Sequence, residues 1–297
     1  MMKAKNNRYM DKCRNGNLYK NRIAVLATMH KKEQVIAPIL KRELGMGLVV
    51  PEQFDTDAFG TFTNEIERAG DQLQAARKKI ENAMLISDQI IGIASEGSFG
   101  SHPMVPFIPF NRELILFVDK EQDLEITGFA ANSNTNYAKK MVGSFDEAYE
   151  FAVAHGFPEH GFIIKATTDT IQREEIEKGI TCLEHLNHAV TKLLDSRSAI
   201  CIETDMRAMY NPTRMKNIEL ATLDLVKKIQ SICPECSTPG YEVVEYKKGL
   251  TCQYCGNPTD LILSHVLECK KCHHKDEVLY PNGKEYADPS RCNWCNP

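Results

Sequence analysis

Residues 233–255 read CPECSTPGYEVVEYKKGLTCQYC, and residues 269–295 read CKKCHHKDEVLYPNGKEYADPSRCNWC. A C-x-x-C turn places two thiolates on one side of a tight bend, and two such turns complete a tetrahedral Cys₄ zinc site. The pattern predicts two structural zinc ions in a C-terminal zinc-ribbon module, residues 233–297. The eight cysteines that would hold them are Cys233, Cys236, Cys252, Cys255, Cys269, Cys272, Cys292 and Cys295.

The sequence leaves the pairing of the four turns open. Sequential pairing joins the first turn with the second and the third with the fourth. It closes the shorter loops, so we favour it. The alternative is an interleaved cross-brace, which joins the first turn with the third and the second with the fourth.

Charge is unevenly spread along the 297 residues, whose formal net charge is −4. Residues 1–22 contain seven Lys or Arg and one Asp, and few apolar side chains, which predicts a basic N-terminal arm. Residues 233–297 contain seven basic and nine acidic side chains, and each Zn(Cys)₄ centre adds further negative charge. Because an acidic module repels phosphates, we expect it to bind a protein partner rather than nucleic acid.

No apolar run approaches the roughly 18 residues that cross a bilayer, and the N-terminus has no signal-peptide pattern. Grouped C-x-x-C pairs favour metal ions in a reducing compartment over disulfides. We therefore expect a cytoplasmic protein without membrane association. A homodimer is left open.

Strands and helices alternate between residues 23 and 232. This alternation predicts an α/β body with a mixed, partly parallel sheet flanked by helices. A hairpin is expected at 113–118 and 125–130, and His102–Asn111, with three prolines, is expected to be a loop. Further strands are predicted at 23–28, 90–94, 161–166 and 199–203, and helices at 70–86, 135–155, 172–193 and 215–232.

Three polar clusters each follow a predicted strand, and ligands of α/β sheets bind outside the carboxyl ends of strands. The first cluster starts a helix, where free N–H groups can bind phosphate. The second carries a carboxylate that could hold Mg²⁺, and the third alternates acids with arginines. Each also has a structural explanation: a capped helix start, a solvated turn and an ion-pair network. The candidates are Thr28, His30, Lys31, Ser95, Glu96, Gly97, Ser98, Asp205, Arg207 and Arg214.

Four segments together resemble a family of uncharacterised bacterial proteins that share a domain of unknown function. The resemblance extends from about residue 23 to the end of the chain and implies no activity. The segments are TFTNEIER (61–68), IIGIASEGSFGSHP (90–103), ETDMRAMYNPTRM (203–215) and DPSRCNWCNP (288–297).

The body also resembles, more weakly, the inosine-triphosphatase and Maf-type nucleotide pyrophosphatases. The similarity lies in the order of a strand, Thr28, a helix, an acidic loop at Glu65, a helix with Lys78 and a strand reaching Glu96. It implies that Glu96 and Glu65 bind Mg²⁺, and that the turn after Thr28, Lys78 and Arg207 bind phosphates. The chain departs from that family at His30 and Glu33, where Asn and Lys are usual.

These observations predict a Mg²⁺-dependent phosphohydrolase that acts on a nucleotide or another phosphorylated small molecule. Its catalytic residues would be Glu96, Glu65 and the neighbouring Asp57. The alternative is a non-catalytic adaptor that binds protein or RNA through the ribbons, with the body as a ligand sensor. Convergence of Glu65 and Glu96 with Arg207 on one cleft would distinguish the two.

Overall fold

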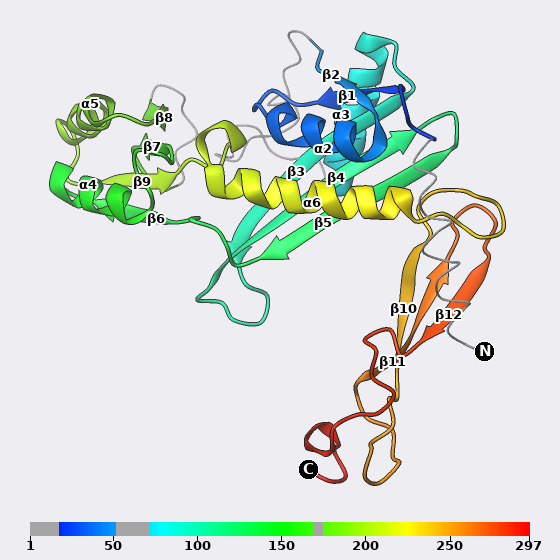
Figure 1. Ribbon diagram of the computed structural model, residues 1–297. Coiled ribbons are helices and arrows are strands. Elements are labelled where there is room, and N and C mark those ends of the chain that lie inside the picture. Colours follow the sequence, from blue (N-terminus) through cyan, green and yellow to red (C-terminus); the bar gives the residue numbers. More distant parts are fainter. Residues whose placement is uncertain (1–17, 52–71, 169–174) are drawn as a thin grey trace. The chain divides into compact units, whose positions relative to one another are not determined.

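The computed structural model describes residues 18–51, 72–168 and 175–297. The chain divides into two compact units (Figure 1). The first, which we call the body, is Gly16–Val226. The second, which we call the tail, has Lys227–Pro297 as its described part.

The body contains a five-stranded sheet of order β2-β1-β3-β4-β5. Its central strand β3 is parallel to β1, which is itself parallel to β2, whereas β3, β4 and β5 form an antiparallel meander. The predicted mixed, partly parallel sheet is confirmed. Its strands are β1 (Ile23–Ala27), β2 (Gly47–Val49), β3 (Ile91–Ser101), β4 (Pro109–Asp119) and β5 (Leu124–Asn132).

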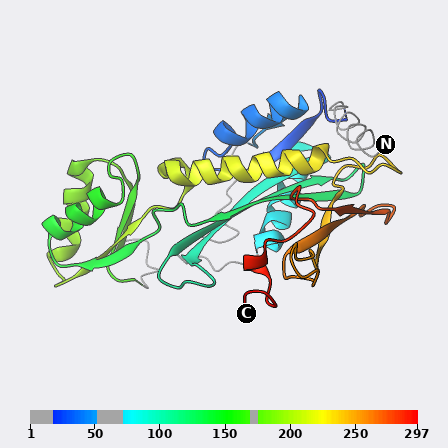
Figure 2. The same ribbon diagram turned by 60° about the horizontal axis from the view of Figure 1, so that its bottom comes forward.

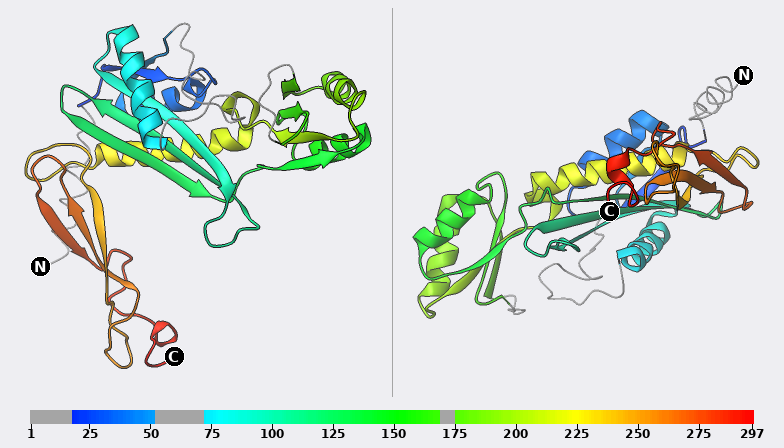
Figure 3. Two further views of the ribbon diagram at one scale, coloured as in Figure 1. Left: turned by 180° about the vertical axis from the view of Figure 1, so that it is seen from behind. Right: turned by 90° about the horizontal axis from the view of Figure 1, so that it is seen from below.

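Helices cover both faces of this sheet, because β3 and β4 carry apolar side chains on each side. Helix α3 (Gln72–Ser87) packs Ala76, Ile80 and Ala83 on one face. Helices α2 (Glu33–Leu44) and α6 (Pro212–Gln230) lie along the opposite face (Figures 2 and 3).

A second, four-stranded antiparallel sheet has the order β6-β9-β7-β8. Helices α4 (Phe145–Ala154) and α5 (Leu183–Leu194) pack on it around a core that includes Phe162, Leu186 and Ile202. Its strands are β6 (Lys139–Val142), β7 (Phe162–Lys165), β8 (Ile176–Ile180) and β9 (Ile200–Thr204).

The predicted single helices over 135–155 and 172–193 are wrong, because each range contains a strand before its helix. Ser144 marks the first boundary: its hydroxyl accepts a hydrogen bond from Glu147 N, while Glu147 Oε2 accepts one from Gly143 N. This Ser-x-x-Glu pattern is a helix start that the sequence already contained. In the second range Gly179, with φ of +72°, lies within β8.

The predicted strand 90–94 does not end at the polar stretch 95–100. Strand β3 continues through it to Ser101 and pairs with β4 over its whole length, so Glu96 lies inside the sheet, opposite Leu114. Strand β4 begins at Pro109, which shortens the predicted loop over His102–Asn111.

The tail contains a three-stranded antiparallel sheet of β10 (Glu242–Lys248), β11 (Ile262–Glu268) and β12 (Lys275–Leu279). Within the ranges that the structure describes, no helix combines the length and the apolar content needed to cross a membrane.

The close approach of α6 to β5 depends on Gly128. A Cβ added there would lie 2.2 Å from Ala221 O and 2.5 Å from Leu225 Cβ. We expect Gly128→Ala to lower the free energy of unfolding by about 1–3 kcal/mol, because the helix backbone must shift. Gly100→Ala is the matched control, since nothing lies within 4 Å of its added Cβ. Equal urea midpoints for the two variants would contradict this packing.

Candidate functional site: two cysteine centres and a buried charge cluster

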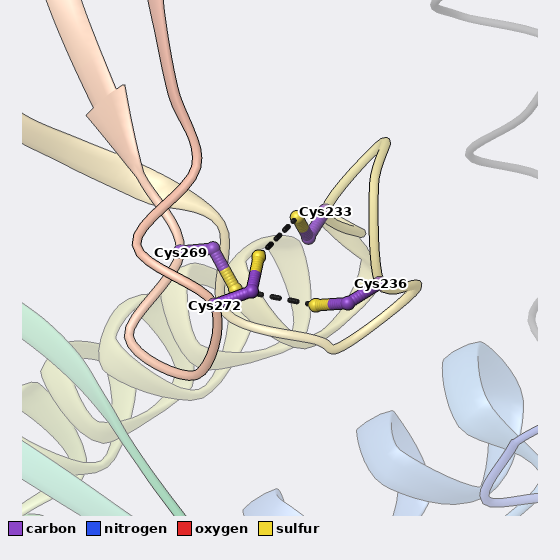
Figure 4. Close-up of side chains that lie close together, drawn as sticks. All are labelled: Cys233, Cys236, Cys269 and Cys272. Carbon is purple, nitrogen blue, oxygen red and sulfur yellow. Dashed lines mark hydrogen bonds between the residues drawn. The ribbon is translucent and has the colours of Figure 1, made fainter.

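The eight cysteines of the tail form two groups of four, and the pairing is interleaved. Cys233 and Cys236 meet Cys269 and Cys272, while the remaining four form the other group. The favoured sequential pairing is therefore wrong, and the cross-brace alternative is confirmed. Figure 4 shows the first group, with thiols from two separate turns converging.

The antiparallel sheet of the tail is the reason for this pairing. Strand β10 leads away from the first turn to the second, β11 returns to the third, and β12 leads away again to the fourth. A strand of seven residues spans roughly 20 Å, so consecutive turns lie at opposite ends of the sheet. The direction of the strands therefore determines the pairing of the turns more than the length of the loops does.

The donor geometry fits zinc. In each group the ligand atoms all lie within 4.8 Å of one another. Sγ–Sγ separations are 3.6 Å for Cys233–Cys272 and for Cys236–Cys269. A tetrahedral centre with Zn–S bonds of about 2.3 Å requires about 3.8 Å between sulfurs. Each group can therefore hold one zinc ion.

The local hydrogen bonds favour thiolates at two of the exposed cysteines. A hydrogen bond with the Thr238 hydroxyl lowers the pKa of Cys236 to about 6. The backbone N–H of Asn257 lowers the pKa of Cys255 to about 7. Zinc binds the thiolate form, whereas the hydrogen bond with Cys255 raises the pKa of Cys295 to about 12, so binding of the ion must also release protons from the remaining thiols.

In the body, a cluster of charged side chains lies just beyond the carboxyl end of β1, beside the parts of β3 and β4 that extend past it. We call this place the carboxyl edge of the five-stranded sheet. The most buried members of the cluster are Arg214, at the start of α6, and Glu113 on β4, whose side chains are both 0% exposed. Arg214 Nε donates to Glu113 Oε1 at 2.9 Å, and its guanidinium lies 5.2 Å from the ring centre of Phe99. This pair fastens the first turn of α6 to the sheet.

Gly97 is required beneath this ion pair. A Cβ at residue 97 would lie 2.4 Å from an Arg214 nitrogen and 2.6 Å from a Glu113 oxygen. From the sequence, Gly97 is a candidate ligand-binding residue. The structure shows that the chain's own Arg214–Glu113 pair occupies that space.

Glu96 is buried on the α3 side, where its Oε1 accepts a hydrogen bond from Lys79 Nζ at 2.6 Å. The predicted phosphate ligand Lys78 is exposed instead. The helical spacing of the buried residues Ala75, Ala76, Lys79 and Ile80 was the signal that could have identified Lys79.

Lys32 and His30 complete the cluster from the turn between β1 and α2. Lys32 is buried and donates from Nζ to the backbone oxygen of Ser95. Burial, followed by the charge of Arg214, lowers the pKa of Lys32 to about 7. Burial and the charge of Lys32 lower the pKa of His30 to about 3, so its imidazole is neutral at physiological pH.

The described charges of this cluster are unbalanced. Lys32 interacts electrostatically with two cations and with two carboxylates. When Lys32 is protonated, the cluster holds three cations against two anions. Buried charge of one sign favours the binding of the opposite charge. The cluster residues are Lys32, Lys79, Glu96, Glu113 and Arg214.

Two buried polar atoms adjoin the cluster without a hydrogen-bond partner in the described part of the chain. They are Ser95 Oγ and Asn111 Oδ1. Ser95 also supplies the carbonyl that Lys32 binds, and Asn111 Nδ2 donates to Glu113 Oε1 at 3.3 Å. Such atoms have unused hydrogen-bonding capacity.

The predicted third cluster forms an ion pair. Asp205 is fully buried and accepts from the guanidinium of Arg207, with an N–O distance of 2.6 Å, and from Gly179 N at 3.1 Å. Arg207 also lies over the Tyr210 ring, 4.7 Å from its centre. It contributes to the positive potential at His30, so the structure brings it near the charge cluster.

The other predicted site residues are distributed as follows. Thr28 is buried and its hydroxyl accepts a hydrogen bond from His30 N at 3.3 Å, while Lys31 is exposed with a φ of +58°. Ser98 is half-buried on β3. Asp57 and Glu65 lie outside the described residues. The sequence analysis did not identify Lys79 or Glu113 as site residues.

A family model described as a domain of unknown function (DUF6671) matches residues 79–297. The matched range contains both cysteine groups together with Lys79, Glu96, Glu113 and Arg214, and it begins after Lys32. Comparison with curated proteins finds no match.

Interleaved zinc binding can be tested by paired substitutions. Cys233→Ser/Cys269→Ser removes two ligands from one centre, so about one zinc ion per chain should remain. Cys233→Ser/Cys252→Ser removes one ligand from each centre and should weaken both. Elemental analysis after dialysis against a mild chelator measures the difference. If Cys233→Ser/Cys252→Ser kept more zinc per chain than Cys233→Ser/Cys269→Ser, the pairing would be sequential.

The buried ion pair should contribute strongly to stability. Glu113→Gln leaves the Arg214 charge without its partner carboxylate and should lower the free energy of unfolding by roughly 3–5 kcal/mol. Glu125→Gln is the matched control, because the Arg77–Glu125 pair is 42% exposed on both sides. That change should cost less than about 1 kcal/mol. Similar denaturation curves for both variants would show that the buried pair contributes no more to the free energy of unfolding than the exposed pair.

Proposed function

We propose that this chain, which belongs to the DUF6671 family, binds a phosphorylated small molecule at the carboxyl edge of its five-stranded sheet and hydrolyses it. A nucleotide is the ligand that the sequence resemblance favours. The observation that supports the proposal is that, among the described residues, protonated Lys32 gives the buried charge cluster three cations against two carboxylates.

Binding of a phosphate group would relieve the repulsion among these cations. Lys32 lies at the N-terminal end of α2, and Arg214 lies in the first turn of α6. Both helix termini add positive potential from free N–H groups. An anion near Lys32 also favours its protonated form, which then adds a full charge to the interaction.

Hydrolysis would use the same charges. When water attacks phosphorus, negative charge on the phosphoryl oxygens must be stabilised, and fixed cations in a buried site do this without reorganisation. In this proposal Lys32 and Arg214 supply those cations. Glu96, held by Lys79, is the carboxylate that we assign to orient the attacking water.

Magnesium stays a prediction. In the described part of the chain, groups of three or more potential metal ligands occur only at the two cysteine centres. Glu96 and Glu113 face Lys79 and Arg214 rather than each other's carboxylate. We therefore derive no step through a metal ion.

A ligand sensor is the second candidate function. The observation that favours it is the Lys79–Glu96 contact, since a carboxylate held by a buried ammonium group is a weaker base than a free one. In this case the body would bind the phosphorylated ligand without consuming it, and the tail would bind a protein partner.

Turnover can be tested with a panel of nucleoside triphosphates and phosphate monoesters, with and without added Mg²⁺. We expect the zinc-loaded protein to release phosphate or pyrophosphate, and Glu96→Gln to reduce the rate by about 100-fold or more. The control Glu125→Gln, far from this edge at the start of β5, should keep the wild-type rate.

The three outcomes separate the candidates. Release that survives in Glu96→Gln would move the reaction to another site. Ligand binding without release would support the sensor. Neither binding nor release, in folded zinc-loaded protein, would contradict both.

A further inference from the structure

The second cysteine centre carries exposed aromatic side chains. Its two turns read Cys-Gln-Tyr-Cys and Cys-Asn-Trp-Cys, so Tyr254 and Trp294 occupy the same position, directly before the second cysteine. They are 84% and 72% exposed. The cysteines that follow them belong to one group whose ligand atoms lie within 4.8 Å of one another, so the two rings project from neighbouring turns.

A third aromatic side chain belongs to the same region. Ala287 forms a bridge with Cys252, and the exposed Tyr286 directly precedes it. Within the described part of the chain, none of these three rings packs against another ring or a cation, in contrast to Tyr241, Tyr246 and Tyr210. We call Tyr254, Tyr286 and Trp294 the aromatic surface.

The first cysteine centre is built differently. The positions equivalent to Tyr254 and Trp294 are Glu235 and Lys271, and the aromatic residue of that centre, Tyr241, is buried against Cys233 and Cys269. Folding around zinc therefore does not require exposed rings, and those of the second centre need another explanation.

The charges around the aromatic surface are mainly negative. Asn293 Nδ2, beside Trp294, donates to the exposed Asp260 at 3.2 Å. Glu285 and Asp288 are exposed on either side of Tyr286 and Ala287. Four thiolates around one zinc ion add a net charge of about −2. Lys284, Arg291 and Lys248, whose Nζ lies 3.5 Å from Asp260 Oδ1, offset the three carboxylates, so the remaining negative charge is that of the thiolate centre.

We propose that the aromatic surface is a docking site for a basic segment of a partner protein, whose Arg or Lys side chains stack on Tyr254 and Trp294. Exposed aromatic rings attract cations through their faces, Trp most strongly, and the negative charge of the adjacent thiolate centre strengthens the attraction. Trp and Tyr are also the side chains that contribute most at protein interfaces. This inference concerns the tail alone and does not depend on the proposed phosphohydrolase activity.

The same charges argue against single-stranded nucleic acid. Bases stack well on Tyr and Trp, but sites that use this stacking pair it with a positive groove for the phosphates. The charge of the thiolate centre beside the aromatic surface would repel a phosphate backbone.

Selection from a displayed library of random short peptides tests the proposal, with the zinc-loaded full chain as bait. Peptides that also bind the double variant Tyr254→Ala/Trp294→Ala are removed, because they bind elsewhere on the chain. We expect the remaining peptides to be enriched in Arg and Lys. Trp294 is the single tryptophan of the chain, so its fluorescence then reports titration with a synthesised peptide from the selection.

Tyr254→Ala should weaken binding of that peptide about tenfold while keeping Trp294 as the reporter. Glu235→Ala and Lys271→Ala, at the matched positions of the first centre, should bind like wild type. Zinc content is measured for every variant, so loss of the fold is recognised.

Five results would overturn the proposal. Four of them are the absence of enriched peptides, enrichment of acidic or uncharged peptides, equal loss in the matched controls, and tighter binding of oligothymidine than of any selected peptide. Trp294 fluorescence that changes with protein concentration alone would assign the surface to a second copy of the chain, and would also overturn it.

Discussion

The ion pair between Arg214 and Glu113 is the interaction on which the body of this protein depends. Both side chains are fully buried, and an unpaired charge in such a place costs several kcal/mol, so neither can be removed alone. The pair joins α6, from late in the body, to β4 in its central sheet. The pair leaves room only for glycine at residue 97. Arg214 Nη1 also donates to the backbone oxygen of Met206, which holds the loop that carries Asp205 and Arg207.

This constraint produces the chemical character of the sheet edge. Lys32 is buried beside this pair, and burial, followed by the charge of Arg214, lowers its pKa to about 7. Glu96 and Lys79 add a second pair from the other face. Full pairing would have produced an inert network. Among the described residues, protonated Lys32 instead adds a third cation to two carboxylates, and the proposed anion binding would depend on that protonation and so on pH.

Much of the fold could be predicted from the sequence because apolar runs mark the strands and helical spacing marks α3. The predicted ends of strands were wrong where buried polar residues extend a strand. On β4, Asn111 and Glu113 lie on the same buried side as Ile115 and Phe117. Alternation along that strand contained the signal for Glu113. Arg214 could be listed as a candidate, but its partner depends on contacts between residues 101 positions apart, which no local pattern encodes.

The cysteine ligands could be predicted from spacing alone, whereas their pairing could not. Short loops favoured sequential centres, but strand direction in β10–β12 places alternate turns at the same end of the sheet. Turn composition then distinguishes the two centres. One buries its tyrosine, and the other presents Tyr254 and Trp294 to solvent.

The measurement that tests the account most directly is a calorimetric titration of inorganic sulfate into wild type and Lys32→Met near pH 8, in two buffers of different ionisation enthalpy. Sulfate does not titrate in this range, so any proton change belongs to the protein. The account predicts saturable binding with proton uptake by wild type, because an anion raises the pKa of Lys32 from about 7. Lys32→Met should bind more weakly and take up no proton. Absence of sulfate binding, or equal proton uptake by both proteins, would contradict it.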